Sequence, residues 1–168
     1  MKRHVVVAAV AAAAVAVGVE TPGWSAAHKH TAAPVRPAPA AAASGLGEIM
    51  SLQQMRHLKL WFAGSAANWE LAAYELDELK EGFDDVLKRF PTHDGVALAP
   101  IVNSLVAREI PGLETAIQAR DAARFASAFD ALTDGCNGCH QSAKHGFIVI
   151  QRPASLPYSN QSFSPKSP

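Results

Sequence analysis

Residues 69–90 carry apolar side chains at spacings of three and four, and this period limits more than any other feature what the chain can fold into. An α-helix turns once every 3.6 residues, so the spacing places these side chains on one face of a helix. Asn68 precedes the run as a suitable N-cap, and Pro91 follows it as a stop. The members of the apolar face are Trp69, Ala72, Leu76, Leu79, Phe83, Val86 and Phe90. The sequence therefore predicts one long amphipathic helix.

Three further stretches have helical signals, and no alternating run indicates a sheet. They are residues 48–63, a run over 98–117, and a segment from the N-cap Asp121 to about Ala143. Pro111 and Gly112 are expected to kink or break the middle one, because proline removes an intrahelical hydrogen bond. Four helices with short loops predict an all-α fold, specifically an antiparallel four-helix bundle.

The two ends of the chain have a different character from the helical part. Residues 1–27 combine "MKRH", a run of fifteen apolar residues and "WSAA", which is the build of a signal peptide cleaved after Ala27. An uncleaved membrane anchor is the alternative. Residues 28–45 are an Ala/Pro-rich linker, residues 46–150 are the expected helical domain, and residues 151–168 are an extended Pro/Ser-rich tail. The leader predicts export to the periplasm.

The two cysteines of the chain, Cys136 and Cys139, lie three residues apart and are followed directly by His140. C-x-x-C-H is the attachment signature of c-type haem, in which both thiols form thioethers and the imidazole ligates the iron. Both cysteines continue the apolar face of the last helix, so one haem c would lie inside the bundle. A redox dithiol lacks its βαβ context, a zinc site lacks further ligands, and a disulfide across three helical residues is geometrically poor.

The stretch "LETAIQARDAARFASAFDALTDGCNGCHQSA" resembles the last helix of the class II c-type cytochromes, the cytochrome c′ group. Residues 46–168 as a whole are similar to bacterial monohaem proteins of the cytochrome c family. The resemblance implies covalent haem at Cys136 and Cys139 with His140 as axial ligand. The tail "FIVIQRPASLPYSNQSF" departs from the cytochrome c′ pattern, whose chains stop soon after the motif.

The sixth position on the iron decides between two functions. A protein ligand there suits one-electron transfer, which is the expected function, whereas an open site suits binding of NO or CO. Met50, Met55 and His57 are the possible ligands in the first helical stretch. His57 is the first choice, Met55 the second, and an open site the third. Gly64 is expected to leave space for the macrocycle on the His57 face. The sequence contains no recognisable pair of acid and base residues for the distal side of the haem, so no enzymatic activity is expected.

Charge and the remaining histidines complete the expectations. The formal net charge is zero, which gives no reason to expect nucleic acid as a partner. Residues 46–150 hold nine Lys/Arg against fourteen Asp/Glu, so a redox partner with a basic surface is expected. The outer face of the helix over residues 69–90 is expected to be an acidic, solvent-exposed surface, with a docking patch as the alternative. Its acidic residues are Glu70, Glu75, Asp77, Glu78, Glu81, Asp84 and Asp85. The only argument for a homodimer is the analogy with cytochrome c′ bundles, which often pair. Contact with a membrane is expected only if the leader stays uncleaved. His93 is expected to be structural in a turn, and His145 to be a surface or capping residue.

Overall fold

The computed structural model describes residues 45–166, so the expected signal peptide and nearly all of the linker lie outside the described residues. The chain divides into two units, Met1–Ala40 and Ala41–Pro168, and every described residue belongs to the second. In this part of the chain, no helix is long and apolar enough to cross a membrane.

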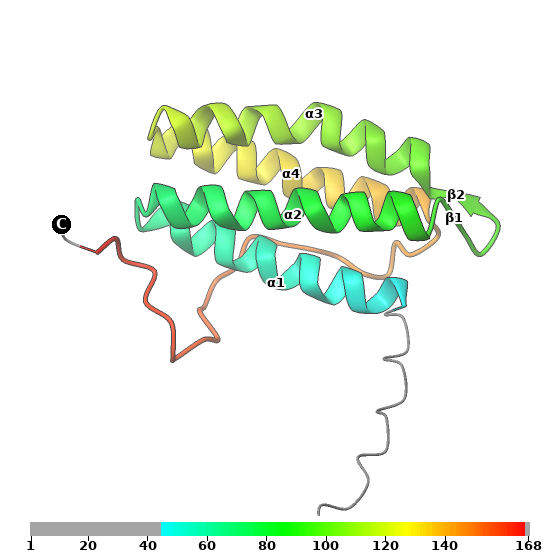
Figure 1. Cartoon of the computed structure of the whole chain (residues 1–168), viewed down its shortest axis with the longest axis horizontal. Helices are drawn as coiled ribbons and strands as arrows, with labels where there is room; N and C mark the ends of the chain where they lie inside the picture. Colours follow the sequence, from blue (N-terminus) through cyan, green and yellow to red (C-terminus); the bar gives the residue numbers. More distant parts are fainter. Residues whose placement is uncertain (1–44, 167–168) are drawn as a thin grey trace, which may run out of the picture. The chain divides into compact units, whose positions relative to one another are not determined.

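Four helices make up most of the described chain (Figure 1). They are α1 (Leu46–Ser65), α2 (Trp69–Arg89), α3 (Leu98–Gln118) and α4 (Ala122–Ser142). The all-α fold class is confirmed. The two predicted helix N-caps are also confirmed. The Asn68 side chain accepts a hydrogen bond from the Leu71 amide at 3.2 Å, and the Asp121 side chain accepts from the amides of Ala123 and Arg124 at 3.0 Å.

A short hairpin between α2 and α3 was not expected. Strands β1 (Thr92–His93) and β2 (Val96–Ala97) pair antiparallel through a two-residue turn. Asp94 and Gly95 form that turn with positive φ values of 48° and 75°. Asp-Gly is a favoured pair for such a turn, because both positions need the left-handed region.

Of the kink or break expected at Pro111, the break does not occur, because α3 is continuous from Leu98 to Gln118. Proline removes one intrahelical hydrogen bond, but side chains on both sides of it are buried in the core. Ile110 is 3% exposed and Leu113 is fully buried. Packing therefore holds the helix together across the missing bond.

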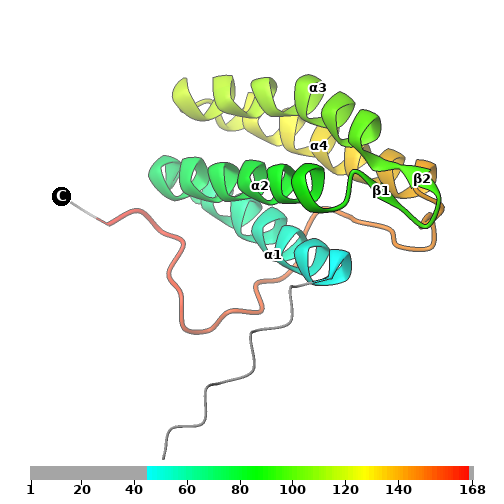
Figure 2. The same cartoon turned by 45° about the vertical axis from the view of Figure 1, so that its right-hand side comes forward.

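The helices contact one another in the order of the chain: α1 packs on α2, α2 on α3 and α3 on α4, while α1 also contacts α4 (Figures 1 and 2). α1 and α4 run in opposite directions, so the start of α1 and the end of α4 lie at the same end of the molecule. This packing is compatible with the expected four-helix bundle. The core includes a very close approach of α1 and α4, where Gly64 lies against the Phe125 ring.

The chain after α4 has no regular secondary structure but does not leave the domain (Figure 1). It runs back along the helices, and Phe163 is buried beside the Phe62 ring with a centroid distance of 6.0 Å. The Asn68 side chain donates a hydrogen bond to the Ser164 carbonyl at 3.4 Å. Residues beyond 150 thus pack on the same core as the helices.

We expect Gly64→Ala to destabilise the protein by about 1–3 kcal/mol, the usual cost of overpacking a core. A Cβ at this position would overlap the Phe125 ring, which is itself buried. Gly112→Ala is the matched control, because its Cβ would meet only the Ala128 methyl at 3.6 Å. Urea unfolding measures both variants. Equal stability of Gly64→Ala and wild type would contradict the close packing of α1 on α4.

Candidate functional site

An apolar cavity of about 400 Å³ lies between the helices at the end where α1 begins and α4 ends. Its volume falls in the range of roughly 300–1,000 Å³ that is usual for small-molecule and cofactor sites. All four helices and the chain after α4 contribute to its wall. The apolar lining includes Leu46, Met50, Leu79, Phe83, Val86, Leu98, Val102, Leu105, Ala143, Ile148 and Ile150.

Cys136, Cys139 and His140 all line this cavity from α4, where helical spacing brings them to one side of the helix. Both cysteines are free thiols and are partly buried. Burial raises the pKa of Cys136 to about 12 and also raises the pKa of Cys139. At neutral pH both side chains are therefore protonated and remain available for a covalent bond.

The His140 ring is oriented by the chain that follows α4. Its Nδ1 lies 3.0 Å from the carbonyl oxygen of Ile148. A carbonyl only accepts hydrogen bonds, so Nδ1 carries the proton and Nε2 keeps its lone pair. This is the tautomer in which a histidine can ligate a metal through Nε2 while its other nitrogen is held in place.

On the opposite wall, α1 contributes Met50, Gln53 and His57. His57 is 4% exposed, and its Nε2 lies 2.8 Å from the Thr133 hydroxyl. Thr133 donates its own proton to the Phe129 carbonyl at 2.9 Å, so the hydroxyl oxygen accepts from Nε2–H. Burial lowers the pKa of His57 to about 4, which keeps the imidazole neutral at physiological pH.

Helix register relates these side chains to His140. His140 follows Thr133 by seven residues, which span about 10 Å along a helix axis. Met50 precedes His57 by seven residues on a helix that runs the other way (Figure 1). Since His57 contacts Thr133, Met50 lies level with His140.

The prediction that Gly64 leaves space for a macrocycle is wrong, because the Phe125 ring already occupies the space beside it. Trp61 packs on the same aromatic cluster, 5.0 Å from the Phe129 ring. Neither residue lines the cavity, which instead extends from His57 toward the start of α1. Met55 also lies outside the cavity wall.

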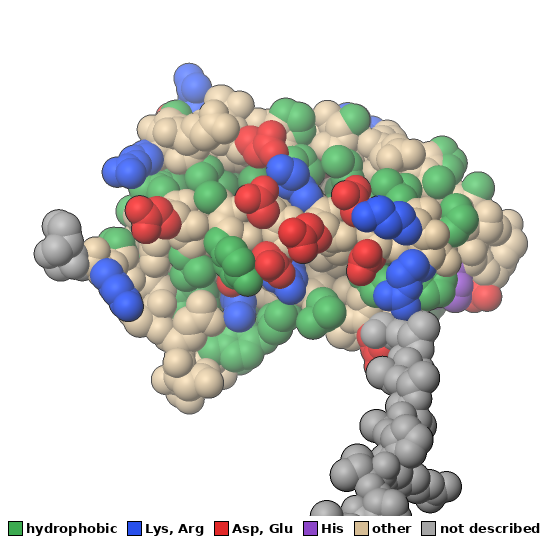
Figure 3. Space-filling model, in the orientation of Figure 1, with side chains coloured by type: hydrophobic (Ala, Val, Ile, Leu, Met, Phe, Trp, Pro, Cys, Tyr) green, Lys and Arg blue, Asp and Glu red, His purple; other side chains and the backbone are tan. Residues whose placement is uncertain are grey.

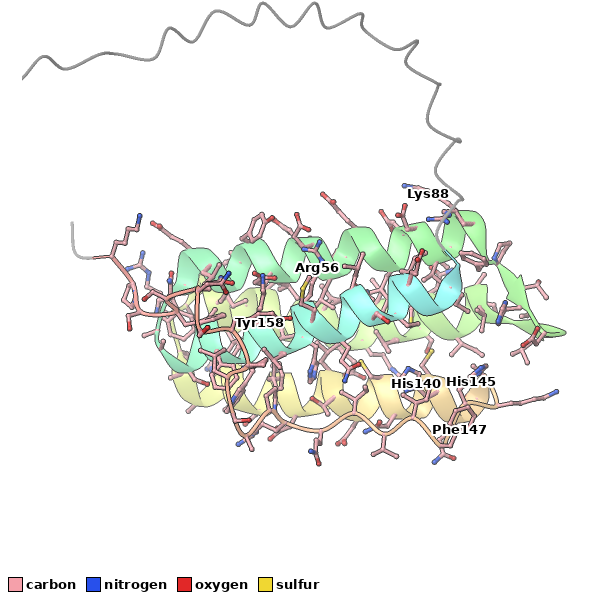
Figure 4. The ribbon with its side chains drawn as sticks, turned by 90° about the horizontal axis from the view of Figure 1, so that it is seen from below. Arg56, Lys88, His140, His145, Phe147 and Tyr158 are labelled. Carbon is pink, nitrogen blue, oxygen red and sulfur yellow. The ribbon has the colours of Figure 1, made fainter. Side chains whose placement is uncertain are left out.

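Two further histidines join the wall, and sequence reasoning missed them there. His93 comes from β1 and His145 from the chain after α4, with ring centroids 6.4 Å apart. Figure 4 shows His145 beside His140 at the end of α4. Within residues 45–166, no group of three or more His, Cys, Asp or Glu side chains could hold a bare metal ion.

The acidic face expected on α2 is only partly a free surface (Figure 3). Glu75 was expected on it but is 2% exposed and lies 4.0 Å from Lys59 of α1, so this placement is wrong. Burial raises the pKa of Glu75. Glu78 pairs with Arg56 of α1. The exposed acidic side chains that remain on α2 are Glu70, Asp77, Glu81, Asp84 and Asp85.

The chain matches no protein-family model, no curated protein and no solved structure.

The burial of the thiols predicts slow alkylation in folded protein whose two cysteines are free. Thiolate is the reactive form, so labelling should accelerate about tenfold per pH unit between about pH 7 and 9, with Cys139 labelled before Cys136. Mass spectrometry after timed exposure to iodoacetamide measures this. The same protein in urea is the control, since its thiols regain their ordinary pKa. Native labelling at pH 7 as fast as in urea would contradict the buried geometry.

Proposed function

We propose that this protein is an exported c-type cytochrome that binds one haem covalently and carries single electrons. The observation that supports the proposal is the placement of two free thiols and an oriented imidazole on one apolar cavity. A thiol pair alone would suit several functions. The cavity, the following histidine and the fixed tautomer together favour haem.

The side chains around the cavity fit this group. Cys136 and Cys139 would each form one thioether bond to a vinyl group, and His140 would ligate iron through Nε2. Bound haem supplies an iron that gains or loses one electron between its ferric and ferrous states. The apolar wall would give the group a low-dielectric surrounding, which is one of the means by which proteins tune such a site. The four helices would act as an antiparallel bundle that holds the group in its core.

The sixth ligand would come from α1, and helix register favours Met50. Met50 lies on the cavity wall level with His140, whereas His57 lies about 10 Å deeper and is bonded to Thr133. His57 stays the second candidate, because its neutral imidazole lines the same cavity. Met55 is the weakest of the three, because it lies outside the wall.

The cellular setting of the proposal follows from the sequence. A cleaved leader over residues 1–27 would deliver the protein to the periplasm, where haem is attached to exported chains. The exposed carboxylates of α2 would attract a redox partner with a basic surface. We propose no enzymatic activity for the site.

The visible spectrum of the purified protein, with and without CO, tests the electron-carrier function. We expect six-coordinate low-spin haem in both oxidation states and no CO binding. Met50→Leu, which keeps the volume and removes the sulfur, should become high-spin and gain CO affinity. His57→Gln and the control Met55→Leu should stay low-spin.

Two other spectroscopic results would contradict parts of this proposal. A high-spin shift in His57→Gln alone would identify bis-histidine ligation and overturn the choice of Met50. High-spin wild-type protein that binds CO would replace the electron carrier with the gas-binding alternative.

A further inference from the structure

The segment that follows α4 contributes to the cavity wall and returns along the helices (Figures 1 and 4). Ile148 and Ile150 belong to the cavity wall, although neither is in a helix or strand. Two side chains of this segment point away from the core: Phe147 is 80% exposed and Val149 is 71% exposed. Ile148 is itself 43% exposed, so this part of the chain buries little apolar surface.

Hydrogen bonds also hold it in place, beginning at the end of α4. The His145 amide donates to the His140 carbonyl at 2.7 Å, and the Ile148 amide donates to the His145 carbonyl at 2.8 Å. These two bonds fold the chain back toward α4. They bring the Ile148 carbonyl to His140 Nδ1.

The next contact is a pair of bonds between one side chain and one backbone position. Asn137 Nδ2 donates to the Ile150 carbonyl at 2.9 Å, and the Ile150 amide donates to Asn137 Oδ1 at 2.8 Å. An amide side chain can satisfy a backbone residue in this way because it carries both a donor and an acceptor. Asn137 stands between the two cysteines, so the anchor lies next to the proposed haem attachment.

Arg152 provides a second anchor two residues later. Its Nε donates to Asp130 Oδ1 at 2.9 Å, and its Nη2 bonds the other carboxylate oxygen. The guanidinium also lies over the Trp61 ring, 4.4 Å from the centroid. Such a bidentate and stacked arginine fixes a chain more firmly than a single exposed ion pair does.

We propose that residues 145–152 form a strap that orients the proximal histidine, with Asn137 and Arg152 as positioning residues. The inference rests on the proposed function, because it assigns His140 to the iron. The strap holds the Ile148 carbonyl on Nδ1–H, which fixes the ring and makes Nε2 a stronger electron donor. A stronger donor favours the ferric state and so lowers the reduction potential.

Two substitutions test the strap in the full-length protein. Asn137→Ala removes both bonds to Ile150, and Arg152→Ala removes the contacts with Asp130 and Trp61. Asn103→Ala is the matched control, because Asn103 is an exposed residue of α3. The measurements are hydrogen exchange at the Ile150 amide and the His140 Nδ1 proton, together with the reduction potential.

We expect both strap variants to keep covalent haem, to exchange the Ile150 amide about three- to tenfold faster, and to have a higher potential. The His140 Nδ1 proton should exchange faster as well, while Asn103→Ala should match wild type. Faster Ile150 exchange with an unchanged potential and Nδ1 proton would overturn the positioning role. Unchanged exchange would overturn the anchors themselves.

Failure of the proposed function has a separate signature. Wild-type protein without covalent haem has no potential to measure, and that result would reject the cytochrome and the strap's role at His140. The Ile150 amide would still report whether Asn137 anchors the chain. The two failures are therefore distinguishable.

Discussion

The apolar cavity beside Cys136 is the constraint on which the rest of the structure depends. It measures about 400 Å³, within the range of roughly 300–1,000 Å³ that is usual for small-molecule and cofactor sites. Side chains from all four helices and from the chain after α4 form its wall, so the arrangement of the helices determines its shape. Cys136, Cys139 and His140 face it from α4.

The functional groups divide between two kinds of structure. α4 presents both thiols and His140 from one rigid helix, and α1 presents Met50 and His57 from another. The orientation of His140, however, comes from irregular chain, through the Ile148 carbonyl. Asn137 and Arg152 tie that chain back to α4 and to Trp61. In this account the helices set the positions of the ligands, and the strap sets the electronic character of one of them.

Local signals in the sequence were enough to find the four helices, although not the short hairpin between α2 and α3. Asn68 and Asp121 cap the helices that they were expected to start, because capping depends only on neighbouring residues. A break at Pro111 does not occur because burial of Ile110 and Leu113 outweighs one missing hydrogen bond. Glu75 was placed outside because the pattern of one helix does not show that α1 covers that side.

The site was less predictable, because it depends on how two distant helices align. Helical spacing placed Cys136, Cys139 and His140 on one side of a helix, and the structure places all three on the cavity. The position of Met50 opposite His140 follows from the contact of His57 with Thr133, which joins residues 76 positions apart. No local pattern contains that information. The same holds for His93 and His145, which reach the wall from a hairpin and from irregular chain.

The central claim is that Cys136 and Cys139 hold a haem covalently. Mass spectrometry of the protein purified from the periplasm, under denaturing conditions, tests this most directly. The account predicts the mass of the chain from residue 28 plus one haem, and the mass of the bare chain for Cys136→Ser/Cys139→Ser. A wild-type mass equal to the bare chain, with or without a disulfide, would contradict the claim.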